Sequence, residues 1–186
     1  MLEAFKKTHD YLVEHVHVPI RRMLMDEIDW NDRLIAIKGG RGAGKTDFLL
    51  NYVKETREKD PELAKQMLYI NLNDFYFTEH SIVEFAGEFV REGGKVLLID
   101  QAFKYPDWSR ELAMCFYQYP KLRIVFAASP VMRLIEDNRD IGASVHLYNL
   151  RGFSFREYLN VTLGLSLCAH TLEDILQNHV EIAQEV

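Results

Sequence analysis

The residues with the clearest chemical potential in this sequence form one glycine-rich stretch, Gly39 to Thr46 (GGRGAGKT). An apolar run at 34–37 precedes it and apolar residues at helical spacing follow it, which predicts a strand, a loop and a helix in that order. Glycines let successive backbone N–H groups turn toward one anion, and the N-terminus of the following helix adds donors and its positive dipole end. A glycine-rich turn with an unrelated lysine is the alternative, and both flanking elements argue against it. The stretch therefore predicts a phosphate-binding loop.

The spacing within this loop is that of the Walker A pattern GxxxxGK[ST], which predicts that a nucleoside triphosphate is bound. Lys45 would reach the β- and γ-phosphates as a point charge, and the Thr46 hydroxyl would be a ligand of Mg²⁺. For Arg41, the sequence does not distinguish a phosphate contact from exposure to solvent. The residues expected to bind the nucleotide are Gly39, Gly40, Arg41, Gly42, Ala43, Gly44, Lys45, Thr46 and Asp47.

A second element with the right chemistry is the segment 95–100 (KVLLID). Four apolar residues that end in an aspartate are typical of a strand buried on both faces of a parallel sheet, as in the Walker B motif. Asp100 would lie at the carboxyl end of that strand and hold Mg²⁺ together with Thr46. A core strand that ends in a turn aspartate is the alternative. The expected metal ligands are therefore Thr46 and Asp100.

The surrounding elements must bring these two motifs together. Five short apolar segments (34–37, 66–72, 95–100, 122–128 and 145–150) alternate with helical patterns, which predicts a three-layer α/β/α sandwich with a mainly parallel, about five-stranded sheet. Helices are predicted to begin with capping boxes at Ser81, Ser154 and Thr171 and with an N-cap at Asp107. Ser129 follows the fourth strand, where it could cap a helix or contact the γ-phosphate.

Composition narrows the range of functions. The net charge of −6 gives no global basic surface, so direct binding of nucleic acid is not expected. No apolar run is long enough to span a membrane and no signal peptide is evident, so a cytoplasmic protein without a membrane partner is expected. Cys115 and Cys168 lie in apolar sequence and are predicted to be buried thiols, with a disulfide as the alternative. His15 and His17 have poor spacing for one helical face and are interpreted as surface residues.

Several motifs in order resemble one family, the prokaryotic AAA-type P-loop ATPases. GGRGAGKT, YINLNDFYF, KVLLIDQ, KYPDWS, KLRIVFAASP and LRGFSFREYL are similar to that family's GxRxxGKT, LxxLDEV, KYPxWS, FTGSS and LSFREYL, over about residues 30–165. The resemblance implies ATP and Mg²⁺ as cofactors and an additional strand between the P-loop strand and the Walker B strand. Family members usually continue into a winged helix and a C-terminal nuclease-like domain.

The resemblance also suggests how the chain is organised. Residues 1–30 are expected to form a helical segment that packs on the core, and residues 31–165 the AAA-type ATPase domain. Residues 166–186 would form a C-terminal helix that begins a lid or a truncated following domain. A homo-oligomer or a protein partner bound through this helix is expected.

Three departures from the family pattern concern hydrolysis. The catalytic positions implied by the resemblance are Lys45, Asp100, Gln101 and Ser129, and the family has glutamate where this chain has Gln101. The sensor segment 127–130 reads AASP instead of TGSS, and the family's arginine falls near Ala143 or Ser144. A neutral amide is no useful base, which lowers the rate by roughly 10²–10⁴-fold. We therefore expect an ATP-binding domain with weak or impaired hydrolysis.

Three other functions remain open at this point. The chain could be a nucleotide-gated interaction module that does not hydrolyse ATP, because a switch does not need turnover. It could be an active ATPase that takes its base or its arginine from a neighbouring subunit. A small-molecule kinase is the weakest of the three, because no motif for an acceptor pocket is present.

Overall fold

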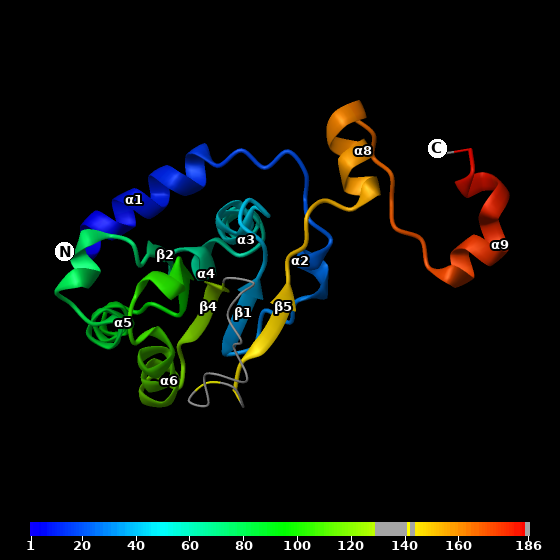
Figure 1. The fold of residues 1–186 in the computed structure, drawn as a ribbon. Helices are drawn as coiled ribbons and strands as arrows, with labels where there is room; N and C mark the ends of the chain where they lie inside the picture. Colours follow the sequence, from blue (N-terminus) through cyan, green and yellow to red (C-terminus); the bar gives the residue numbers. More distant parts are fainter. Residues whose placement is uncertain (129–140, 142–143, 185–186) are drawn as a thin grey trace. The chain divides into compact units, whose positions relative to one another are not determined.

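The computed structural model describes residues 1–128, 141 and 144–184 of the chain (Figure 1). These residues divide into two compact units, each of which is described by itself. The larger unit comprises Met1–Val18 and Met23–Gly152, and the smaller unit comprises Pro19–Arg22 and Phe153–Val186. Ser129, a predicted catalytic position, and Ala143, near which the family's arginine falls, lie outside the described residues.

The larger unit is built on a sheet of five parallel strands in the order β2-β3-β4-β1-β5 (Figure 1). The strands are β1 (Leu34–Lys38), β2 (Met67–Asn71), β3 (Val96–Asp100), β4 (Arg123–Ala128) and β5 (His146–Asn149). This sheet confirms the predicted fold class. Strand β4 lies between the P-loop strand β1 and the Walker B strand β3, so the additional strand expected from the family resemblance is also confirmed.

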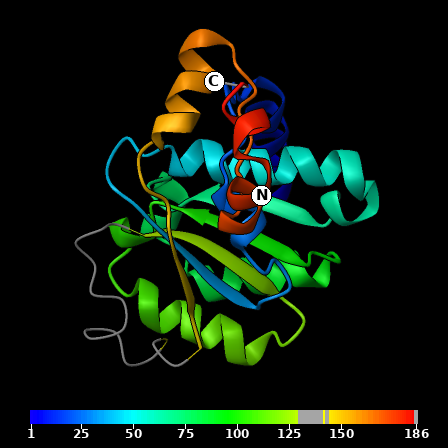
Figure 2. The same cartoon turned by 90° about the vertical axis from the view of Figure 1, so that its right-hand side faces the viewer.

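Helices cover both faces of the sheet and make the fold three layers deep (Figure 2). On one face, α3 (Lys45–Lys59) packs Phe48 and Leu49 against Ile35. On the other face, α5 (Ile82–Arg91) and α6 (Trp108–Gln118) pack Phe85 and Leu112 into a second core cluster. Because side chains alternate along a strand, each central strand contributes to both clusters. The remaining elements of this unit are α1 (Leu2–His15), α2 (Leu24–Glu27), α4 (Pro61–Ala64) and the 3₁₀ turns η1 (Phe75–Thr78) and η2 (Ala102–Lys104).

The start of α5 differs from its prediction. The Ser81 hydroxyl accepts a hydrogen bond from Glu84 N at 3.1 Å, but the described side chains show no reciprocal bond from Glu84. Instead, the Glu111 carboxylate of α6 accepts from Ile82 N at 2.6 Å and from Val83 N at 3.2 Å. The predicted capping box is therefore half formed, and a carboxylate from another helix accepts from the next two backbone N–H groups. Asp107 does precede α6, but its side chain makes no capping hydrogen bond.

The N-terminal helix α1 covers the open edge of the sheet at β2. Tyr69 N faces outward from this edge strand and donates to His9 Nδ1 at 2.9 Å. His9 is only 4% exposed, and burial lowers its pKa from 6.5 to about 4. The ring therefore stays neutral and accepts the backbone hydrogen bond. Sequence patterning gave no sign of this role, whereas the expected surface positions of His15 and His17 are confirmed.

The two cysteines differ from each other. Cys115 is buried on α6, where burial raises its pKa to about 12, and this part of the prediction is confirmed. Cys168 is exposed, so its predicted burial is wrong. Both thiols are free.

The smaller unit contains α8 (Phe155–Leu163) and α9 (Leu172–Ile182), and both predicted capping boxes are confirmed there. Ser154 and Glu157 cap α8 reciprocally, and the buried Glu157 also accepts from Arg22 Nε at 2.9 Å. Helix α9 has no buried residue and exposes an apolar stripe of Leu172, Ile175 and Leu176, and the exposed Val180 lies beyond a break in helical geometry at Asn178. None of the described helices is both long and apolar enough to cross a membrane.

Candidate nucleotide site

The phosphate-binding loop joins β1 to α3 at the carboxyl edge of the sheet. Gly42 (φ 80°) and Gly44 (φ 85°) adopt the left-handed conformation, which glycine reaches at little cost. Gly39 is restricted for a different reason, because a Cβ at this position would lie 2.5 Å from the Leu150 carbonyl oxygen that follows β5. Two of the glycines thus permit the turn, and the first permits close backbone packing.

Lys45 is the first residue of α3, and its side chain folds back over the loop. Its Nζ donates to Gly39 O at 2.7 Å and to Gly40 O at 2.8 Å. Burial lowers the pKa of Lys45, and the charge of Asp100 opposes this shift. The ammonium group is thus held at the centre of the loop, where a phosphate oxygen could contact it.

Asp100 is the centre of the polar network at this edge of the sheet. Its Oδ2 accepts from the Thr46 hydroxyl at 2.5 Å and from the Tyr69 hydroxyl at 2.9 Å, and its Oδ1 accepts from Gln101 N at 2.7 Å. Asp100 is only 3% exposed, and these donors satisfy the hydrogen-bonding capacity of its buried oxygens. The structure therefore brings Thr46 and Asp100, the two predicted metal ligands, into direct contact.

Sequence analysis missed Tyr69 as a member of this network. It lies on β2, next to β3, and its hydroxyl crosses to the neighbouring strand. Burial and the adjacent Asp100 raise the pKa of Tyr69, so the hydroxyl is a donor at every physiological pH. The only sign in the sequence was a tyrosine, with its polar hydroxyl, two residues before the end of a mostly apolar strand.

Gln101 has an unusual backbone conformation. With φ 56° and ψ 32° it is the one non-glycine residue of positive φ in the described ranges. This left-handed turn redirects the chain from β3 into η2, beside the phosphate-binding loop. Residues without glycine's freedom are found in such conformations mostly at functional sites.

A pocket of about 660 Å³ opens between the loop and η2. Most of the predicted nucleotide-binding residues line it, and Phe103, Lys104 and Ala127 line it too although they were not predicted. Gly39, Gly40 and Ala43 belong to the loop but do not line the pocket, and Ser129 lies outside the described residues. The lining residues are Arg41, Gly42, Gly44, Lys45, Thr46, Asp47, Asp100, Gln101, Phe103, Lys104 and Ala127.

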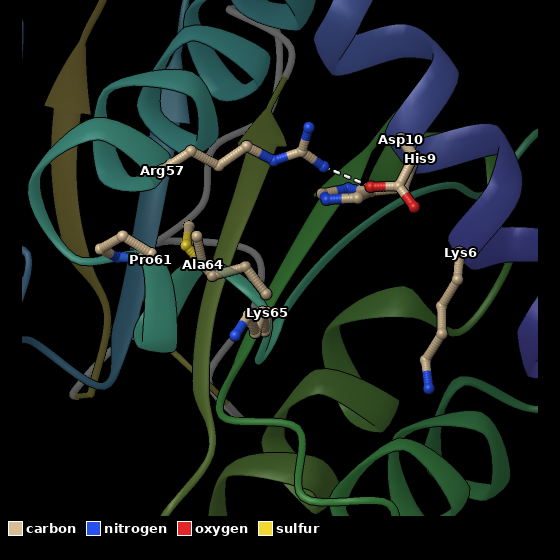
Figure 3. A pocket seen from close by; sticks show the side chains of 8 residues that line it. Lys6, His9, Asp10, Arg57, Pro61, Ala64 and Lys65 are labelled. Atoms are coloured by element: carbon tan, nitrogen blue, oxygen red, sulfur yellow. Dashed lines mark hydrogen bonds and ion pairs between the residues drawn. The ribbon is translucent and has the colours of Figure 1, made fainter.

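A second pocket, of about 400 Å³, lies between α1 and the end of α3 (Figure 3). Its cations are already paired: Arg57 with Asp10, Lys6 with Glu92 at 2.6 Å, and Lys65 with Glu62 at 2.7 Å. In the P-loop pocket, by contrast, neither Arg41 nor Lys104 forms an ion pair with a described residue. The P-loop pocket is therefore the better site for an anion.

The donor set at Thr46 and Asp100 suits Mg²⁺, which prefers hard oxygen ligands and tends to keep oxygens from phosphate and water. The described residues contain no group of three or more His, Cys, Asp or Glu side chains that could hold a metal. A cation at Thr46 and Asp100 would take its remaining oxygen ligands from water or from a bound phosphate. The pair fits a metal that arrives with its nucleotide.

Comparisons with known proteins identify the family and the fold. A protein-family model described as an AAA domain matches residues 31–159, and no curated protein matches significantly. AMPPCP-bound DnaA from Aquifex aeolicus has a similar fold, with a TM-score of 0.50 and 15% identity over 96% of this chain and 57% of that one. PCH-2 from C. elegans follows with a TM-score of 0.45 and 13% identity over 80% of this chain and 42% of that one. The chain thus spans about half the length of these relatives.

Proposed function

The chain belongs to the AAA domain family, and on this basis we propose that it is a Mg²⁺-dependent ATP-binding P-loop domain with weak hydrolysis. The observation that carries the proposal is the 2.5 Å hydrogen bond between Thr46 and Asp100 at the base of the P-loop pocket. These two side chains come from separate motifs, 54 residues apart, and meet where a metal bound to nucleotide phosphates needs oxygen ligands.

Each loop residue has a definite task in this proposal. The glycines at 42 and 44 allow backbone N–H groups to surround the phosphates, and Lys45 neutralises the charge on the β- and γ-phosphates. Mg²⁺, when bound, would offset further phosphate charge. Tyr69 donates to Asp100 and so fixes the orientation of that carboxylate.

Weak hydrolysis follows from Gln101. An amide at this position can orient a water molecule but cannot accept its proton, whereas a glutamate can do both. The left-handed backbone of Gln101 places the residue between Asp100 and η2, on the wall of the pocket. In this proposal the loop binds ATP, and the side chain of Gln101 accounts for the low rate of hydrolysis.

The test is a paired measurement on the unmodified protein and on Gln101→Glu. Calorimetry would measure Mg·ATP binding, and phosphate release would be followed on the same samples. We expect both proteins to bind ATP and Gln101→Glu to release phosphate roughly 10²–10⁴-fold faster.

Lys45→Ala is the matched control for the site. It should abolish binding, because it removes the cation held at the centre of the loop. Absence of ATP binding by the unmodified protein, with no change in Lys45→Ala, would contradict the nucleotide proposal. Equal and negligible turnover in the unmodified protein and in Gln101→Glu would contradict the assignment of the lost rate to Gln101.

A second candidate function is a nucleotide-gated interaction module that does not hydrolyse ATP. The observation that favours it is α9, whose apolar residues Leu172, Ile175 and Leu176 are exposed. Such a stripe is typical of a helix that binds a partner or a second copy of the chain. Sedimentation with and without Mg·ATP would test it, and a mass that does not respond to nucleotide or partner would count against it.

A further inference from the structure

Lys104 is placed at the mouth of the P-loop pocket by the short turn η2. Its backbone N–H donates to Gln101 O at 2.8 Å, and Ala102, fully buried, anchors the turn in the core. The residue after it, Tyr105, donates its hydroxyl to Glu111 at 2.7 Å. The backbone of Lys104 is therefore fixed on both sides, while its side chain lines the pocket and is exposed.

The charges in the pocket leave Lys104 available for a ligand. Lys45 is already engaged by two loop carbonyls, and Asp100 accepts hydrogen bonds from three donors. The ammonium group of Lys104 contacts the face of Phe103 at 5.6 Å and pairs with no carboxylate of the described residues. An exposed cation beside an anion site interacts most strongly with an anionic ligand when that ligand partly excludes solvent.

The position of Lys104 points to the terminal phosphate. In the proposed function, the loop amides and Lys45 hold the phosphates, and the metal and the attacking water lie beside Asp100 and Gln101, which also line the pocket. Lys104 follows Gln101 by three residues and lines the same pocket. Arg41, the other unpaired cation, belongs to the loop itself.

We propose that Lys104 binds the γ-phosphate and thereby makes the site prefer a nucleoside triphosphate over a diphosphate. This inference rests on the proposed nucleotide function and adds the residue that distinguishes the two nucleotide states. The γ-phosphate of a nucleoside triphosphate contacts Lys104, whereas a nucleoside diphosphate has no γ-phosphate to reach this residue.

The test compares the binding of Mg·AMPPCP and Mg·ADP by calorimetry, because AMPPCP retains a γ-phosphate and is not hydrolysed. Lys104→Ala should weaken AMPPCP binding about tenfold and change ADP binding less than about twofold. Lys104→Arg should retain most of the preference for the triphosphate. Lys121→Ala removes an exposed lysine outside the pocket and should change neither affinity.

Two outcomes would overturn the inference and can be told apart. If the unmodified protein binds both nucleotides and Lys104→Ala leaves their ratio of affinities unchanged, Lys104 does not contact the γ-phosphate. If the unmodified protein binds neither nucleotide, the proposed function fails and the role of Lys104 fails with it. Circular dichroism of each variant checks that the fold is retained.

Discussion

Acidification should weaken the contact between α1 and the edge strand β2 at His9 and destabilise the fold. The His9 ring is buried between α1 and β2, and its Nδ1 must be unprotonated to accept the hydrogen bond from Tyr69 N. A proton on Nδ1 would make it a donor facing the Tyr69 N–H donor, so the hydrogen bond would be lost, and it would place a positive charge in a buried site. Arg57 from α3 disfavours that charge, whereas Asp10 on α1 favours it, and Lys6 and Lys65 line the same pocket (Figure 3).

The size of the effect follows from the two pKa values of His9. The unfolded chain titrates at 6.5 and the folded chain at about 4, so between these values the unfolded chain binds more protons. The stabilisation is full above about pH 6.5, decreases as the pH falls, and is absent below about pH 4. A difference of that size corresponds to about 3 kcal/mol, of which about 2 kcal/mol is lost by pH 5.

The assay is urea denaturation at several pH values between 7.5 and 4.5, on the unmodified protein and on His9→Asn. Asparagine can place its Oδ1 near the position of Nδ1 and does not titrate, so the carboxylates that titrate in the same range cancel in the comparison. We expect the free energy of unfolding of His9→Asn to fall less, by about 2 kcal/mol, between pH 7.5 and pH 5. His15→Asn, at an exposed histidine, serves as the control and should follow the unmodified protein.

Parallel pH profiles for the unmodified protein and His9→Asn would refute this reasoning. They would mean that His9 has a similar pKa in the folded and the unfolded chain. A profile for His15→Asn that departs from the unmodified protein would assign the pH dependence to the surface of α1 instead.

Two further predictions concern packing around the site. Gly39→Ala should destabilise the protein by about 2 kcal/mol or more and weaken ATP binding, because the new Cβ would lie 2.5 Å from Leu150 O. Gly40→Ala is the control: its Cβ would enter open space, so this variant should unfold like the unmodified protein. Thermal denaturation of the pair measures this, and equal melting temperatures would contradict the role of Gly39. Glu111→Ala should lower the free energy of unfolding by about 2–3 kcal/mol, because Ile82 N, Val83 N and the Tyr105 hydroxyl lose their acceptor. Glu111→Gln should lower the free energy of unfolding by about half as much, because the amide keeps one acceptor oxygen. Urea denaturation measures the loss, and a loss below about 0.5 kcal/mol in Glu111→Ala would show that water replaces the carboxylate.

The sequence was sufficient where the signal is local. The Walker A loop, the Walker B strand and the capping boxes at Ser154 and Thr171 each lie within a few consecutive residues, and the structure has them where the pattern predicts. The position of β4 between β1 and β3 required the family resemblance, because spacing along a chain does not encode the order of strands in a sheet.

The sequence was insufficient where partners are distant. His9 and Tyr69 are 60 residues apart, Tyr69 and Asp100 are 31 apart, and Glu111 caps a helix that begins 29 residues before it. None of these side chains has a pattern that announces its partner. A local capping rule at Ser81 likewise could not predict that Glu111 of α6 accepts from Ile82 N and Val83 N. Cys168 was predicted to be buried because its neighbours in sequence are apolar, but the neighbouring Leu165 is itself exposed.

The way in which α1 covers β2 also bears on the order in which the protein folds. The helix is synthesised first, yet its contact with Tyr69 spans 60 residues and requires β2 to be present. Contacts between segments so far apart form slowly, because the intervening chain must be ordered before they become favourable. The outer backbone groups of β2 are therefore exposed whenever β2 has formed and α1 has not yet docked. In that interval the nascent chain carries an open strand edge that could pair with another chain, and the time it takes α1 to dock sets how long the chain is at risk of aggregation.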